Sequence, residues 1–239
     1  MTVISVKSVI QNVVSAMKIV ESVTVIAGST PWGVTGLTRT DNLFVGQRLK
    51  FVGTGPNLTA YVEVASIVSD TEISISSDTN LTPNTKANNP GTLTPVINFH
   101  HGHIMELSQT FQEWTRKGSV KREQFPAVCL IAPYTERRGL PGYECEVKSR
   151  VVILTDSRPE YKADDRDTNT FEPILIPLYE KLLQKMKDSH QIADLSPEHD
   201  FVRRYYWAKS GAYGNTAPIF NDFIDGIDLN FTFKILKTC

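Results

Sequence analysis

The sequence predicts an α+β fold: a mostly antiparallel sheet of about four strands, packed by two or three helices, with a small all-β module inserted. Two observations lead to this prediction. Segments with apolar residues at helical spacing flank a stretch of short alternating segments. The composition also changes near Glu21 and changes back near Val96, and Ser, Thr, Asn and Gly dominate between them. We therefore expect an α+β core formed by residues 1–20 and 96–239, and a β module at residues 21–95.

The overall composition is that of an ordinary globular protein. The chain has 239 residues, of which 41% are hydrophobic, and 25 basic residues balance 26 acidic ones to a net charge of −1. A neutral chain argues against a dedicated polyanion binder, because counterion release needs a basic surface. Three cysteines without a C-x-x-C pair exclude a disulfide scaffold and an all-cysteine zinc site. No apolar run approaches the ~18 residues of a membrane span.

The first half of the chain combines one helix with several short strands. An apolar stripe over residues 6–18 predicts a helix that faces the core. Alternation of polar and apolar residues then predicts strands at 22–26, 48–52, 61–68 and 72–76. Pro31 and Gly33 place Trp32 in a turn, and the Pro- and Asn-rich stretch 78–94 reads as a long loop.

The second half is expected to form the core. Helical spacing predicts helices over 103–117 and 171–186, and the acidic loop 156–169 precedes the second helix. The predicted strands of the sheet are 125–131, 144–155, 203–207 and 227–236.

Three polar clusters are candidate sites of chemistry. His100-His-Gly-His103 has the donors of a zinc site, but a turn that caps the following helix explains the same residues. Glu144-x-Glu146-x-Lys148 is similar to half of a metal-dependent nuclease site, and polar alternation on a half-exposed strand explains it equally. The acidic run 164–167 fits a helix N-terminus better than a calcium loop, which needs alternating ligands and a closing glutamate.

Catalytic motifs of other kinds are also missing from the sequence. The glycines of residues 28–33 have the spacing of a phosphate loop, but Val34 replaces the essential lysine, and no G-x-S-x-G occurs. We therefore predict a protein that is not an enzyme, with no catalytic residues, no metal and no cofactor. A well-patterned, neutral chain of this kind points to binding or assembly.

Several motifs in the last three-fifths of the chain carry a family resemblance. Phe99-His-His-Gly-His-Ile-Met-Glu106 and Gln124-Phe-Pro-Ala-Val-Cys-Leu-Ile131 resemble the Y-G-H-x-x-E-I and K-Y-P-L-I-A-L patterns of neck and tail-assembly proteins. Further matches follow in order at residues 172–180, 206–207 and 220–228. These neck and tail-terminator proteins belong to tailed bacteriophages of Bacteroidetes, including the crAss-like phages.

The resemblance implies a structural virion protein that forms a homo-oligomeric ring at the head–tail junction, as a neck protein or tail terminator. Its implied partners are copies of itself and the portal, head-completion or tail proteins of the same virion, with non-specific contact to genomic DNA and no membrane. The implied location is the virion, after assembly in the host cytoplasm. Three alternatives stay open. One is another structural position in the phage (baseplate, tail or head decoration). The second is a metal-dependent nuclease that uses His100, His103, Glu144 and Glu146. The third is a clamp that binds the outgoing genome in a basic ring lumen.

Ring formation needs surfaces that contact neighbouring subunits and the genome. Aromatic and histidine side chains are our candidates for the subunit interface, with Trp32 as the main anchor. These candidates are Trp32, Phe44, Tyr61, His101 and Tyr206. The basic turn after the second helix supplies the candidate DNA-facing residues, which are Arg116, Lys117, Lys121 and Arg122.

Overall fold

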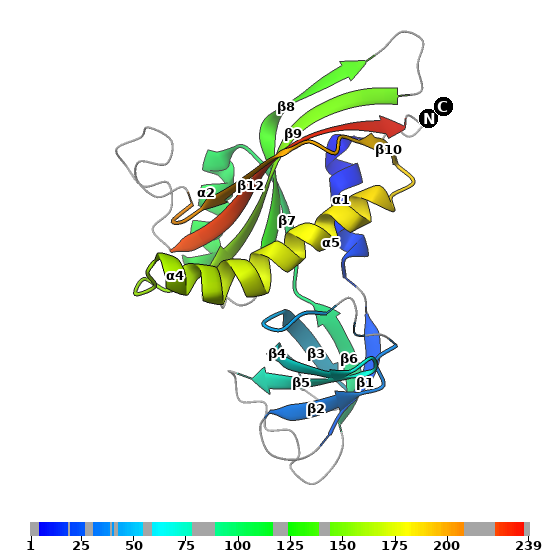
Figure 1. The fold of residues 1–239 in the computed structure, drawn as a ribbon, viewed down its shortest axis with the longest axis vertical. Coiled ribbons are helices and arrows are strands. Elements are labelled where there is room, and N and C mark those ends of the chain that lie inside the picture. The colour runs from blue at the N-terminus through cyan, green and yellow to red at the C-terminus, as the bar shows by residue number, and fades with distance from the viewer. Residues whose placement is uncertain are drawn as a thin grey trace. The chain divides into compact units, whose positions relative to one another are not determined.

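The chain folds into two compact units in a computed structural model. One unit comprises Met1–Met17 with Ile97–Cys239, and the other comprises Lys18–Val96. The structure describes residues 5–18, 20–26, 31–38, 40, 43–54, 59–77, 89–116, 124–138, 144–207 and 223–236. Figure 1 shows both units, the first with helices around a sheet and the second with strands as its only labelled elements. None of the described helices is long and apolar enough to cross a membrane.

The second unit is a closed barrel of six antiparallel strands (Figure 1). The strands are β1 (Glu21–Val25), β2 (Trp32–Thr35), β3 (Arg48–Gly53), β4 (Thr59–Ser69), β5 (Glu72–Ser77) and β6 (Asn89–Pro95). Around the barrel they follow the order β1-β2-β5-β4-β3-β6, and β6 pairs with both β3 and β1 to close it. Closure pairs every strand on both sides, so the barrel has no open edge.

Alternation along each strand fills the barrel interior with apolar side chains. Val34, Phe51 and Ile75 are fully buried there, because every second residue of a strand points to the same face. Gly91 of β6 is needed at its position, since a Cβ there would lie 2.5 Å from the Val52 carbonyl oxygen and 2.7 Å from the Phe51 ring.

The first unit is built on a six-stranded mixed sheet. Its strands are β7 (Asn98–Gly102), β8 (Ala127–Arg138), β9 (Glu144–Asp156), β10 (Ile192–Leu195), β11 (Asp200–Arg204) and β12 (Ile224–Leu236). The order is β10-β12-β9-β8-β7, and β11 pairs with β12 beside β10. Only the pairing of β7 with β8 is parallel among the described strands.

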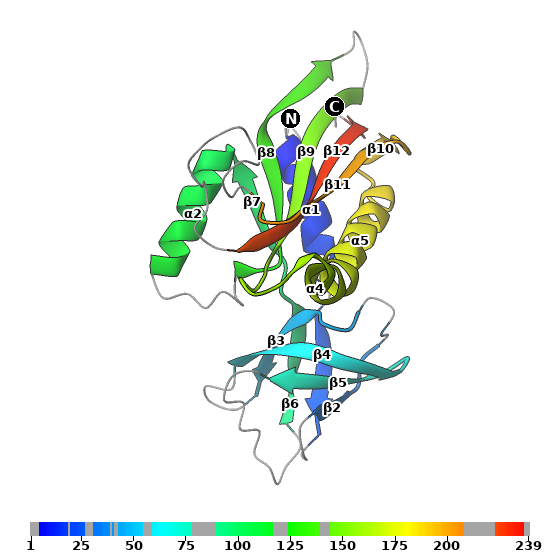
Figure 2. The ribbon, with the colours of Figure 1, turned by 60° about the vertical axis from the view of Figure 1, so that its left-hand side comes forward.

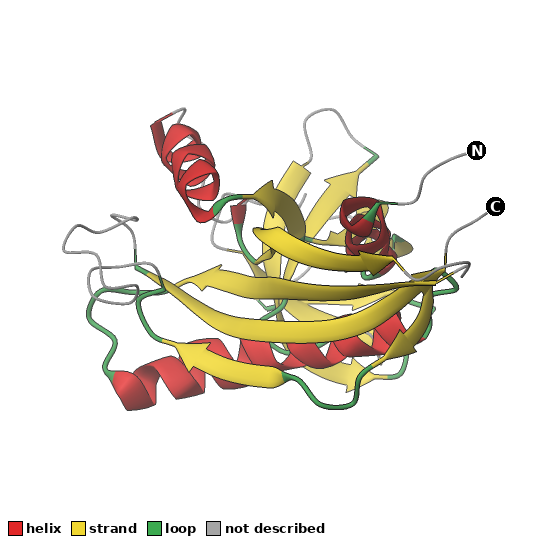
Figure 3. Cartoon of the chain, turned by 90° about the horizontal axis from the view of Figure 1, so that it is seen from above, coloured by secondary structure: helices red, strands yellow, loops and turns green. Residues whose placement is uncertain are grey.

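Helices lie on both sides of this sheet. The helical segments are α1 (Val6–Ala16), α2 (Ile104–Arg116), α4 (Ala163–Arg166), the π-helical η1 (Asp167–Leu175) and α5 (Ile176–Lys187). Figure 2 shows α2 on one side and α5 on the other, and α1 contacts α5. Figure 3 shows the run α4–η1–α5 as one long helix below the strands. A serine capping box, in which Ser5 and Ser8 exchange backbone hydrogen bonds, begins α1.

The predicted fold class is wrong. Strands make up 51% of the described residues, and the structure has a closed six-stranded barrel and a six-stranded mixed sheet in place of one four-stranded sheet packed by helices. The reason is that alternation identifies a strand but not its partners. The expected loop 78–94 hid β6, because its sequence Asn-Pro-Gly-Thr-Leu-Thr-Pro contains the residues that usually break strands.

Three local expectations also need correction. Trp32 lies at the start of β2 rather than in a turn. The expected acidic loop 156–169 is helical from Ala163 onward. The expected strand 203–207 is displaced, since β11 ends at Arg204 and residues 205–207 form a turn.

Candidate subunit interface

β11 and the turn that follows it form an exposed apolar edge of the sheet unit. Phe201 and Val202 are 36% and 37% exposed, and Tyr205 is 39% exposed. β11 pairs with β12 from Asp200 to Arg204 without a register shift, and it has no other partner among the described strands. This edge therefore presents a regular backbone together with large apolar side chains.

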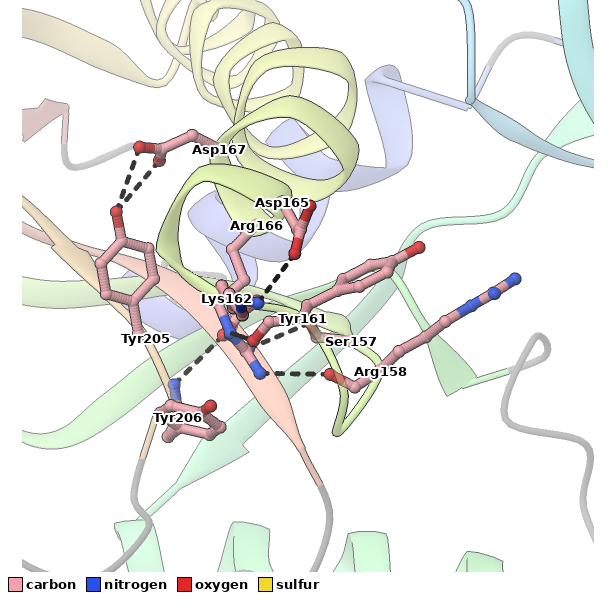
Figure 4. Close-up of polar contacts among 10 residues, drawn as sticks. Ser157, Arg158, Tyr161, Lys162, Asp165, Arg166, Asp167, Tyr205 and Tyr206 are labelled. Atoms are coloured by element: carbon pink, nitrogen blue, oxygen red, sulfur yellow. Dashed lines mark hydrogen bonds and ion pairs between the residues drawn. The ribbon is translucent and has the colours of Figure 1, made fainter.

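A buried ion pair contacts the turn that follows β11, and Figure 4 labels its arginine, Arg166. Arg166 of α4 and Asp225 of β12 are both almost fully buried, and their Nη1 and Oδ1 atoms lie 2.5 Å apart. The guanidinium also donates hydrogen bonds to the backbone oxygens of Tyr161 and Arg158 and to the Ser157 hydroxyl, all at 3.0–3.1 Å. Because the cation has both a carboxylate and neutral acceptors, its burial is compensated.

The same pair holds the turn after β11 in an uncommon conformation. Tyr206 has a φ of 53°, which is rare for a residue other than glycine. Its backbone N–H donates to Asp225 Oδ1 at 3.1 Å, and its ring centroid lies 3.9 Å from the Arg166 guanidinium carbon. Trp207, which follows, is fully buried, and its backbone N–H donates a hydrogen bond to the backbone oxygen of Ile224. The turn is thus fixed by three contacts, which involve the Tyr206 N–H, the Tyr206 ring and the Trp207 N–H.

Asp167 connects β11 to the helix on the outer side. It accepts hydrogen bonds at 3.2 Å from Arg203 Nη1 and from the Tyr205 hydroxyl (Figure 4 shows the latter). Burial and this hydrogen bond to the carboxylate raise the pKa of Tyr205. The Tyr205 ring also packs edge-on against Phe171 at 5.3 Å. Exposed as they are, these side chains are held in one arrangement.

An aromatic cluster supports the other end of β11. The Tyr179 hydroxyl lies 2.7 Å from His199 Nε2, and the Tyr179 ring packs against Phe201 at 4.9 Å between centroids. The His199 ring in turn lies 4.9 Å from the Phe231 ring. Burial of the phenol and the nearby Glu180 raise the pKa of Tyr179. Phe201 therefore packs against Tyr179 on one side, while about a third of its surface is exposed to solvent.

A polar groove of about 510 Å³ crosses the sheet next to this cluster. Its lining includes Lys148 and Arg150 as well as the acidic Glu198 and Asp200. Arg150 is occupied by Asp228, which accepts two hydrogen bonds from it at 2.7 Å. With both charges present and one arginine already paired, the groove favours no ligand of a single charge.

The candidate interface residues are divided between the two units. Trp32 is 9% exposed and packs in the barrel core, which leaves little of its side chain for a neighbouring subunit. Phe44 and Tyr61 are half-buried parts of the same barrel unit. His101 lies in β7 and Tyr206 follows β11, so these two flank opposite edges of the sheet.

The candidate DNA-facing residues fall mostly outside the described residues. Arg116 is the last residue of α2, and only its backbone is described. Lys117, Lys121 and Arg122 lie outside the described residues.

The residues of the nuclease alternative are not brought together. His100 is aligned through Cys129 with Val152 of β9, six residues along that strand from Glu146. Six strand residues correspond to roughly 20 Å. Glu106 accepts a hydrogen bond from the His103 N–H at 2.8 Å, which is a helix cap. Within the described part of the chain, no three His, Cys, Asp or Glu side chains are grouped to hold a metal ion.

Sequence reasoning missed Arg166 and Asp225, although a signal for the pair was present. The apolar strand 224–236 contains two aspartates, Asp225 and Asp228, at positions where burial is expected on both faces. A buried carboxylate needs a cationic partner, and both aspartates have arginines. Asp228 is paired with Arg150 and also lies 3.4 Å from Arg204 Nε. Comparisons of the chain with protein-family models, with curated proteins and with solved structures gave no match.

Proposed function

We propose that this chain is a structural subunit of a tailed-bacteriophage virion, which assembles with copies of itself into a ring at the head–tail junction. It acts by self-association and docking rather than by catalysis. The observation that carries the proposal is β11, an edge strand with exposed Phe201 and Val202 on a rigid support. The ordered motifs over residues 97–236 give the proposal its place in the virion.

The chemistry of this edge is that of a protein interface. Interface cores are enriched in aromatic residues and arginine, and β11 with its turn combines Phe201, Tyr205 and Arg203 within five residues. Their arrangement is already set by Asp167 and Tyr179. A surface that is ordered before it binds loses less conformational entropy on association.

In this proposal the ring docks onto portal, head-completion or tail proteins of the same virion and surrounds the genomic DNA. Its subunits assemble in the host cytoplasm before they enter the particle. Contact with DNA is non-specific, since a chain with a net charge of −1 offers no excess of basic residues for tight binding.

Labelling of the assembled virion tests the proposal directly. Gold-conjugated antibody against the chain should mark the junction of head and tail in electron micrographs, and the purified protein should form rings in negative stain. Label at the baseplate, along the tail or on the head surface would assign the chain to another structural position. Virions that contain none of the protein would refute a structural role.

A further inference from the structure

β7 and β11 are two edge strands of the sheet unit that lack the protective features of its other open strand segments. Natural sheets protect their edges with lysines, prolines or bulges. β10 has a register shift between Ile192 and Asp194, and the part of β8 that extends beyond β7 contains Pro133 and a register shift. β7 and β11 pair with their single described neighbours in continuous register over five residues each. Neither strand contains proline or lysine, and the two arginines of β11 form ion pairs with Asp167 and Asp228.

These two edges also match each other in position along the sheet. The pairings align Asn98 with Ala127, Leu154, Gly226 and finally Arg204. At the other end, the same pairings align Gly102 of β7 with Asp200 of β11. β7 and β11 therefore have equal lengths, and they lie at the same position along the strand direction on opposite edges of one sheet.

Strand direction is compatible with joining the two edges in successive copies. β7 is parallel to β8, and each of the following steps to β9, β12 and β11 is antiparallel. β7 and β11 therefore run in opposite directions. A rotation about an axis along the strands preserves these directions, so it places β11 of one copy antiparallel to β7 of the next. Such a head-to-tail contact closes into a ring when the rotation closes.

We infer that β11 of one subunit adds to the outer edge of β7 of a second copy of this chain, so that the sheet continues from subunit to subunit. This inference rests on the proposed ring function and names the contact by which the ring forms. At matching height, Phe201 lies opposite His101 and Arg203 lies opposite Phe99, in each case on the same face. Aromatic pairs and an arginine beside an aromatic ring are favourable cross-strand neighbours. The backbone groups of both strands supply the hydrogen bonds.

A charged residue in the middle of β11 tests the contact. Val202→Lys places a lysine on an already exposed position, where it blocks strand addition without disturbing the core. We expect light scattering after gel filtration to show monomers for this variant, with the circular dichroism spectrum of the wild type. Val68→Lys, on an exposed valine of the barrel unit, is the matched control and should assemble normally. A Val202→Lys protein that assembles like the wild type would overturn the inference.

Disulfide trapping identifies the partner edge. In a Cys239→Ser background, Phe99→Cys combined with Arg203→Cys should give a ladder of covalent oligomers beyond the dimer when oxidised glutathione is added. Either cysteine alone should give none. Self-pairing of β11 would instead place Val202 opposite its own copy, so dimers from Val202→Cys alone would overturn the inference.

The two proposals fail in distinguishable ways. A disulfide ladder from a protein that antibody does not locate at the head–tail junction would contradict the proposed function and leave the β7–β11 contact standing. Label at the junction together with no ladder and an assembling Val202→Lys variant would contradict the contact and leave the function standing.

Discussion

Removal of the cationic partner of Asp225 should strongly destabilise the sheet unit. Arg166→Met keeps much of the side-chain length but removes the guanidinium, so a fully buried carboxylate loses its ion pair. The variant also loses the hydrogen bonds to Tyr161, Ser157 and Arg158. Breaking a buried pair by removing one partner costs about 3–5 kcal/mol. We expect the free energy of unfolding to fall by that amount.

Urea unfolding followed by tryptophan fluorescence measures this loss in the correct unit. The chain has three tryptophans, and a Trp32→Phe background removes the one in the barrel unit. The remaining Trp114 and Trp207 belong to the sheet unit, and Trp207 is fully buried beside the turn that Arg166 supports. Its fluorescence should report the unfolding of that unit alone.

Two further variants control the interpretation. Arg203→Met breaks an ion pair with Asp167 whose partners are 41% and 33% exposed, so it should cost less than about 1 kcal/mol. Arg166→Met combined with Asp225→Leu removes both charges and should recover much of the stability, because no unpaired charge stays buried. The reasoning is refuted when Arg166→Met is no more costly than Arg203→Met.

Three other predictions follow from single features of the structure. Gly91→Val should lower the thermal stability of the barrel, measured by circular dichroism, because its side chain would meet the Phe51 ring. Burial raises the pKa of the Cys129 thiol, so mass spectrometry should find it unalkylated by iodoacetamide until denaturant is added. Burial and Lys7 lower the pKa of His101 from its usual 6.5. The unfolded chain then binds the proton more readily, so stability should decrease as the pH falls below about 6.5, and less so in His101→Gln.

The elements of the sheet unit show what the sequence alone could predict. The strands expected at 144–155 and 227–236 lie within β9 and β12, because long apolar runs leave few other interpretations. The short strand β11 was displaced by three residues, since Asp-Phe-Val-Arg-Arg-Tyr-Tyr-Trp has no residue that marks its end. What ends the strand is Tyr206, whose conformation depends on Asp225, a residue 19 positions away. A contact of that kind is absent from any local pattern.

The barrel shows why Trp32 is buried although the sequence suggests an exposed anchor. The prediction depends on the expectation that a small β module has too little interior for Trp32, Phe44, Phe51 and Tyr61 together. Closure changes the geometry, because all six strands then turn one face inward and enclose a common core. Trp32 and Phe51 are consequently buried.

The open sheet, unlike the closed barrel, has edges with unpaired backbone groups. Its edge is for this reason the stronger candidate for assembly. A sheet that does not close must end in two strands with unpaired backbone groups, and each end has to be protected or used. β10 has an irregular register, whereas β11 is regular and carries exposed apolar residues, and a buried ion pair holds the turn that follows β11. A buried pair adds little to stability compared with an apolar substitute, so its value here lies in fixing one geometry. The fixed geometry is that of the edge through which we propose that the subunits join.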